Sequence, residues 1–351
     1  MFEYRTTSAV RRVWRYAASA MLLTNVLVAH AAVFCVGTEV ALRNALSTAA
    51  SNADTRNTIY IQAGTINITG STGYDGLYYY SAATKSLSIL GGRNSACTAS
   101  GGITTLDAGN HTNILRILTS STSSVLVQEI VFAHGNSQYA MHGSALTVEG
   151  SGSVTVQLDQ FIANSAAQSA MALDVAANVL RVNNNLFVAN AGQMFAAARL
   201  GAKTGLVNGN TIVANRDTDP STWNSHVAVF LRDSGMDDSV PGKFYLSNNI
   251  LWDNTADVGG SMYDVYSLLP MELRNNDIGS YTGIATINTG NMSVDPDFQP
   301  SWFISVQLAP GSPLVNAGLD SPPGGTTSVD LAGLPRIIGP HIDIGAYELR
   351  Y

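Results

Sequence analysis

The chain has 351 residues, a net charge of −7 at pH 7, and only 12% charged residues. Its first 31 residues carry four arginines and one glutamate, so the remainder has a net charge of −10 and holds all three lysines. Nucleic-acid binding needs a basic footprint, which this balance excludes, and tight binding of polyanionic glycans without a bridging cation is disfavoured for the same reason.

Residues 1–31 have the three parts of a secretory signal peptide. A basic start is followed by an apolar run at 17–29 and by the small-residue cleavage pattern Ala29-His30-Ala31. The run is shorter than the roughly 18–20 apolar residues that span a bilayer. We therefore expect cleavage, export to the extracellular space, outer surface or periplasm, and no transmembrane segment in the mature chain.

Residues 32–100 predict an N-terminal cap with the first strands. Thr38 is suited to cap a helix whose apolar face includes Leu42 and Leu46, and alternating strands follow near 58–62 and 87–90. A helix over the first coil would cover its unpaired strand edge.

Two further features lie in this region. Cys35 and Cys97 of an exported chain predict a disulfide that closes a loop of about 60 residues and contributes roughly 4 kcal/mol; two free thiols are the alternative. The cluster Tyr78, Tyr79 and Tyr80 either stacks on sugar rings or, as is more common for such clusters, anchors a loop on the coil.

One pattern recurs through the middle of the chain. Hexamers with an apolar centre and a final Asn stand at 159–164, 185–190 and 210–215. A fourth follows at 249–254, and a fifth precedes at 129–134 with His134 in the Asn position. A repeat of about 25 residues is typical of a solenoid.

The residues within each copy predict strands. Val154, Val156 and Leu158 alternate with polar neighbours, which is the period of a strand and not of a helix. The expected fold is all-β: a right-handed parallel β-helix with coils over 101–300, in which equal positions stack at about 4.8 Å. The repeated asparagines belong at the corners, where we expect structural ladders of Asn164, Asn190, Asn215, Asn254, Asn185, Asn210, Asn249 and Asn276.

The irregular stretch 216–242 indicates a loop insertion, and long loops on a rigid scaffold often carry the functional residues of a protein. Its residues suited to line a ligand groove or hold calcium are Trp223, Asp217, Asp219, Asp237 and Asp238. The acidic loop lacks the ligand order of an EF-hand, so no cofactor is predicted beyond this calcium possibility.

Charged residues recur in similar positions of successive copies: Asp174, Arg199, Arg232 and Asp264. Outward-facing, they would form a stripe able to bind sugars, with Asp174 and Asp264 as a conceivable acid–base pair. A cross-strand ion-pair ladder explains the alternation of signs more simply. Catalytic residues therefore stay undefined.

The closing segment, 301–351, is rich in Gly and Pro and predicts a final coil with its cover. Its sequence resembles the closing segment of choice-of-anchor Q proteins of the pectin-lyase-like superfamily, in the stretches LAPGSPLVNAG and DLAGLPRIIGPHIDIGAYE. Charges such as Asp330 and Arg336 would satisfy turn backbones; a metal site from His341, Asp343 and Glu348 is the alternative.

The resemblance implies the β-helix fold but no single activity. The leading interpretation is a secreted or cell-surface protein, non-enzymatic and adhesin-like, that binds a polysaccharide or cell-surface glycan. The alternatives are a polysaccharide lyase or glycoside hydrolase, and a passive structural surface protein. Nothing in the sequence defines an oligomeric state.

Overall fold

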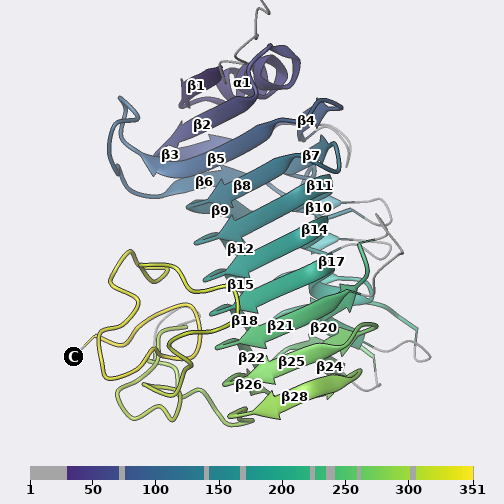
Figure 1. Cartoon of the computed structure of the whole chain (residues 1–351), viewed down its shortest axis with the longest axis vertical. Helices are drawn as coiled ribbons and strands as arrows, with labels where there is room; N and C mark the ends of the chain where they lie inside the picture. The colour runs from purple at the N-terminus through teal and green to yellow at the C-terminus, as the bar shows by residue number, and fades with distance from the viewer. Residues whose placement is uncertain are drawn as a thin grey trace, which may run out of the picture.

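The computed structural model describes residues 30–70, 76–137, 142–166, 171–221, 226–234, 242–258, 262–300 and 306–350. Within them the chain winds as a parallel β-helix whose coils stack along the long axis, with a helix at one end (Figure 1). The predicted signal peptide, save its last two residues, lies outside the described residues.

The largest sheet has fifteen strands in two columns that share three long strands. The first column comprises β4 (Leu77–Ser81), β7 (Leu115–Thr119), the shared β11 (Leu146–Gln157), β14 (Leu173–Asn183) and β17 (Phe195–Asn208), then β20 (His226–Arg232), β24 (Met262–Ser267) and β27 (Tyr281–Thr282). The second adds β1 (Ala31–Val36), β2 (Arg56–Gln62), β5 (Ser86–Arg93) and β8 (Ser124–Gln128) before the shared strands, and β21 (Lys243–Ser247), β25 (Met271–Arg274) and β28 (Ala285–Thr289) after them.

Two further sheets contain the other strands of the coils. The eight-stranded sheet contains β3 (Gly64–Asn67), β6 (Thr104–Asp107), β9 (Ile130–Ala133), β12 (Gln160–Ile162), β15 (Leu186–Val188), β18 (Thr211–Val213), β22 (Ile250–Trp252) and β26 (Asp277–Ile278). The five-stranded sheet contains β10 (Asn136–Ser137), β13 (Ser165–Ala166), β16 (Ala191–Gly192), β19 (Arg216–Asp217) and β23 (Thr255–Ala256). The all-β solenoid is thus confirmed.

Apolar residues of equal register stack inside the coils. Phe132, Phe161 and Phe187 lie opposite one another on β9, β12 and β15, with ring centroids 5.2 and 4.5 Å apart. Because each inward row repeats one coil later, the core is one continuous column of side chains along the axis.

The helix α1 (Glu39–Ser51) covers the first coil, as predicted. Thr38 accepts a hydrogen bond from the Ala41 amide at 3.3 Å, and the buried Leu42 and Leu46 join the core. The buried Lys85 ammonium donates to the carbonyls of Ala49 and Asn52, among others, at the other end of the helix, where the last carbonyls lack helical partners.

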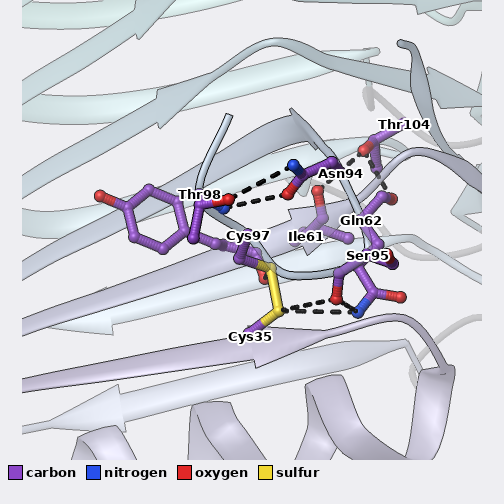
Figure 2. Close-up of a disulfide and its surroundings, with 9 residues drawn as sticks. Cys35, Ile61, Gln62, Asn94, Ser95, Cys97, Thr98 and Thr104 are labelled. Carbon is purple, nitrogen blue, oxygen red and sulfur yellow. Dashed lines mark hydrogen bonds between the residues drawn. A yellow bond between two sulfur atoms is a disulfide. The ribbon is translucent and has the colours of Figure 1, made fainter. Parts of the chain in front are cut away.

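The predicted disulfide joins Cys35 on β1 to Cys97 after β5, at a sequence separation of 62 (Figure 2). Beside it, the Gln62 amide donates to the Ser95 carbonyl at 2.8 Å, which holds the loop of Cys97 against β2. The disulfide therefore links β1, at the capped end, to the loop that follows β5.

The repeated asparagines form two buried ladders. One runs through Asn164, Asn190, Asn215 and Asn254, and the other through Asn185, Asn210, Asn249, Asn276 and Asn291. After the first rung of each ladder, each side-chain oxygen accepts the backbone N–H and the side-chain amide N–H of the rung before it, and each amide also donates to a carbonyl. The ladders thus satisfy backbone groups that the corners leave unpaired.

Two details of the corners differ from the prediction. The left-handed residue is the one before each ladder Asn, so the ladder residues themselves do not adopt that conformation. In the first ladder this residue is an alanine or an aspartate, as at Ala163, and in the second it is a glycine or another asparagine, as at Asn184. Register also places Gly135, and not His134, opposite Asn164, whose side-chain oxygen accepts the Gly135 amide at 2.8 Å. The earliest hexamer is therefore offset by one residue.

The closing segment does not cover the end of the last coil but packs along the flank of the eight-stranded sheet, beside β18 and β22 (Figure 1). Its apolar residues Leu314 and Ile344 contact a cluster that includes Val213 and Ile250. Four outward asparagines of successive coils donate to its backbone carbonyls: Asn184, Asn208, Asn248 and Asn275. The closing segment lies along the flank because the outward asparagine amides at the corners offer hydrogen-bond donors along the side of the stacked coils.

Candidate functional site

One outward row of the first column carries the candidate site. Parallel pairing aligns eight residues across the strands, in the order Tyr78, Arg116, Thr147, Asp174, Arg199, Phe230, Tyr266 and Thr282. The predicted stripe is thus correct for Asp174 and Arg199 only. Arg232 pairs with Gly201, two residues further along its strand, and Asp264 precedes the row by two residues.

Asp174 and Arg199 form a buried ion pair between neighbouring strands. Arg199 Nε lies 2.9 Å from Asp174 Oδ1, and Nη2 lies 2.6 Å from Oδ2, so the contact is bidentate. The side chains are 1% and 8% exposed, respectively. Burial raises the pKa of the Asp174 carboxyl, and the two charge-assisted bonds from Arg199 oppose that rise. The predicted cross-strand ion pair is present here.

A second acidic residue, Glu149, lies beside this pair. Its carboxylate is 3.4 Å from Arg116 Nη2 and 3.8 Å from His142 Nδ1. Burial, and then the positive charge of Arg116, lower the pKa of His142, which favours the neutral ring. Glu149 therefore finds its charge partner in Arg116.

Aromatic side chains form a ledge next to the ion pairs. The rings of Phe195 and Phe230 stack with centroids 4.7 Å apart, and Tyr266 meets Phe230 edge-on at 5.6 Å. The ledge borders a groove of about 490 Å³ lined by His142, Glu149, Met194, Phe195, Arg199, Phe230 and Arg232. The groove thus joins flat apolar surfaces to several charged groups.

Arg232 enters the groove over a glycine. A Cβ placed on Gly201 would lie 3.3 Å from the guanidinium carbon of Arg232 and 3.2 Å from the Asp233 carbonyl oxygen. Arg232 Nη1 donates to that carbonyl at 2.9 Å, and its Nε is buried without a hydrogen-bond partner. The missing side chain at position 201 therefore lets the guanidinium lie against the sheet.

The cluster does not suit a metal ion. Ligand atoms of His142, Glu149 and Asp174 lie within 4.8 Å of one another. However, Asp174 is committed to Arg199, and Glu149 to Arg116. A cation would have to displace one arginine or lie against both, which like-charge repulsion opposes.

Asp264 is separate from this site. Its second carboxylate oxygen accepts the amides of Gly279 and Ser280 at 2.8 and 3.0 Å, so it holds a corner of the next coil. Its strand, β24, is three strands from that of Asp174, a separation of about 14 Å at the usual strand spacing. Paired glycosidase carboxylates lie about 5–9.5 Å apart, so the proposed pairing of Asp174 with Asp264 is wrong.

The other ligand-binding candidates are dispersed. Tyr78 and Tyr80 are 51% and 58% exposed on β4, but Tyr79 is buried in the core. Asp217 is also buried, where it accepts the amides of Met194 and Asp219. Asp219 is buried as well and accepts the Ser221 amide, so neither aspartate lines a groove. Trp223, Asp237 and Asp238, with the calcium possibility, lie outside the described residues.

The stretch 216–242 is not simply a loop. It contains β19 and β20, and β20 carries Phe230 and Arg232 of the groove. The repeat that contains residues 216–242 is therefore longer than the others, but two of the strands in this stretch, β19 and β20, belong to the coil itself.

The closing segment holds no metal site among the three residues considered. His341 Nδ1 contacts the Asp320 carboxylate at 2.9 Å, whereas Asp343 accepts the amides of Asn316 and Leu349. Glu348 pairs with Arg336 inside the segment. These side chains point to different partners, as the prediction of satisfied turn charges implies.

Sequence reasoning missed Glu149, His142, Phe195 and Phe230. The spacing of Phe230 and Arg232 could have revealed Phe230 as a site residue, because residues two apart on one strand share a face. Glu149 gave no such signal because it lies where the pairing of β11 with β14 shifts, between Val148 and Ser151.

No family model, curated protein or solved structure matches this chain. Across the described residues, none of the helical structure has the length and apolar character that a bilayer crossing requires.

Proposed function

We propose that this chain is a secreted or cell-surface β-helix protein that binds a carbohydrate polymer along the outward row from Tyr78 to Tyr266, without cleaving it. The observation that carries the proposal is the groove in which an aromatic ledge meets buried, paired charges. Ligand sites in proteins commonly combine flat apolar surface with a few fixed polar groups. The resemblance to choice-of-anchor Q proteins supports the same placement at a surface.

The ledge supplies the apolar part of such a site. Phe230 and Tyr266 are partly exposed, and both belong to the outward row. Aromatic rings bury large apolar areas with little loss of conformational freedom, and Tyr adds a polar end. They suit the apolar faces of sugar rings.

The row supplies the length that a polymer needs. Its positions repeat at about 4.8 Å, so eight strands extend over roughly 34 Å. Tyr78 at one end and Tyr266 near the other place exposed aromatic surface on both sides of the charged centre. A chain of sugar units lying parallel to the coil axis would contact both.

The same geometry disfavours hydrolysis. Asp174 is 1% exposed, and both of its carboxylate oxygens accept hydrogen bonds from Arg199, so it is poorly placed as a nucleophile or acid. A working acid–base pair needs two carboxyl groups that reach the substrate. Glu149 has no such accessible partner among the described residues of the groove.

The test is binding to a panel of immobilised polysaccharides, with wild type and Phe230→Ala compared. Loss of the ring should weaken binding at least about tenfold, while Tyr245→Ala, on the second column of the same sheet, should leave it unchanged. Assays for new reducing ends and unsaturated products run on the same mixtures. Products that disappear in Asp174→Asn would establish the enzymatic alternative instead, and full binding by Phe230→Ala would refute this site.

A further inference from the structure

Among the described residues, the charges in and beside the groove do not balance. Arg199, Arg232 and Glu149 line the groove, whereas Asp174, the partner of Arg199, and Arg116, the partner of Glu149, lie beside it. Arg232 forms no ion pair with any described residue, because the adjacent Asp233 carboxylate pairs with Lys203 at 3.1 Å instead. Arg232 is thus a cation held by one backbone carbonyl.

The surroundings of Arg232 make this state unfavourable without a partner. Burial and the neighbouring positive charge of Arg199 lower the pKa of Arg232, and the carboxylates of Asp174, Glu149 and Asp233 offset that shift only in part. Its buried Nε donates to nothing, and a guanidinium that loses water without gaining an acceptor destabilises the protein. An anion supplied from outside would restore the balance.

Arg232 and the ledge are within reach of one ligand unit. Phe230 and Arg232 lie two residues apart on β20, about 7 Å along the strand, and their side chains share the outward face. Leu231 between them is fully buried, which confirms the direction of both neighbours. A sugar ring against Phe230 can therefore direct a ring substituent to the guanidinium.

We infer that the groove selects an acidic sugar: a unit whose carboxylate pairs with Arg232 while its ring rests on the aromatic ledge. This inference rests on the proposed carbohydrate binding and names its ligand class. The guanidinium fork matches carboxylate geometry, which a neutral hydroxymethyl group cannot satisfy. The acidic chain as a whole repels such polymers, so the selection is local and requires this groove.

The test uses matched ligands that differ only in charge. The probes are hexamers of β-1,4-linked glucose, β-1,4-linked mannose and α-1,4-linked galactose, each as the neutral chain and with C6 oxidised to a carboxylate. Binding of the full mature chain is measured by calorimetry in buffer with and without a chelator. The variants are Arg232→Gln, Arg232→Lys and Phe230→Ala, with Arg181→Gln as control, an arginine on the outward face of the other half of β14.

At least one oxidised hexamer should bind about tenfold or more tightly than its neutral partner, with the difference reduced by salt. Arg232→Gln should abolish that difference, Arg232→Lys should restore part of it, and Arg181→Gln should have no effect. Phe230→Ala should weaken both forms. Melting curves of each variant report that it is folded.

Two results would overturn the inference while carbohydrate binding stands. One is equal binding of neutral and oxidised hexamers; the other is acidic binding that survives Arg232→Gln or requires the metal that the chelator removes. Absence of binding by every hexamer, with polysaccharide binding also absent, would overturn the proposed function itself.

Discussion

Replacing Asp159 with Asn should stabilise this protein. Asp159 is fully buried at the start of the second ladder, in the position that Asn occupies in every later coil. Its Oδ1 accepts the Ile130 amide at 2.8 Å, as an Asn oxygen would. Its Oδ2 is buried and has no hydrogen-bond partner.

The neighbouring rungs show what Oδ2 faces. The Asn185 amide donates to the Val156 carbonyl and to Asn210 Oδ1, both at 3.0 Å. Since Val127 lies opposite Val156, the equivalent groups for residue 159 are the Val127 carbonyl and Asn185 Oδ1, which are both acceptors. A carboxylate oxygen needs a proton in this position, whereas an amide nitrogen brings two donors.

Burial accordingly raises the pKa of Asp159 well above its ordinary value. The unfolded chain releases this proton near pH 4, but the folded chain retains it to higher pH. Stability therefore falls as pH rises above about 4, by at most roughly 1.4 kcal/mol per pH unit until the folded pKa is passed. Since an unpaired buried acceptor costs about 1–3 kcal/mol, Asp159→Asn should gain about 2 kcal/mol at pH 7.5 and much less at pH 4.

The assay is urea unfolding of the mature chain, followed by circular dichroism, between pH 4 and pH 8. The reciprocal variant Asn185→Asp is the control and should lose stability, because it places a carboxylate between acceptors in the middle of the ladder. A gain for Asp159→Asn that is independent of pH, or a loss at pH 7.5, would refute the reasoning.

Three other substitutions test the fold. Removing the disulfide with Cys35→Ser and Cys97→Ser should cost about 4 kcal/mol, measured by urea unfolding against wild type with and without reductant, which should not affect the double variant. Gly205→Ala should lower the free energy of unfolding by more than about 1 kcal/mol, because its Cβ would lie 2.1 Å from the Phe244 ring. Adding Phe244→Leu should recover part of this loss in thermal melts, and an unchanged melting temperature for Gly205→Ala would contradict the packing. Arg336→Met should lower the free energy of unfolding by about 1–3 kcal/mol at pH 7, because it removes the donors to Glu348 and to the Asp343 and Gly345 carbonyls. Since burial raises the pKa of the Glu348 carboxyl to about 8, the loss should grow above pH 8, where the ionised carboxylate needs Arg336; adding Glu348→Gln should remove that increase, and a neutral single variant would argue against this pair.

The sequence by itself determined the fold of this protein. A strand period of two, corner asparagines at a spacing near 25 residues, and a capping pattern before Leu42 are local signals, and the parallel coils, the ladders and α1 follow them. Such signals suffice because every coil repeats the same contacts with its neighbours. The disulfide likewise followed from two cysteines in a chain with a predicted signal peptide.

Only the tertiary structure decided the site and the position of the closing segment. Phe230, and not the predicted Arg232, lies opposite Arg199. The pairing of β17 with β20 shifts by one residue between Phe195 and Ala198, and without that shift Arg199 would lie opposite Leu231. A second shift follows Val148 and sets the place of Glu149. Such irregularities move a residue between rows, and they depend on the packing of neighbouring coils, which no local pattern encodes. The closing segment lies along the flank for a related reason: its partners are asparagine amides from coils 40 to 160 residues away in the chain.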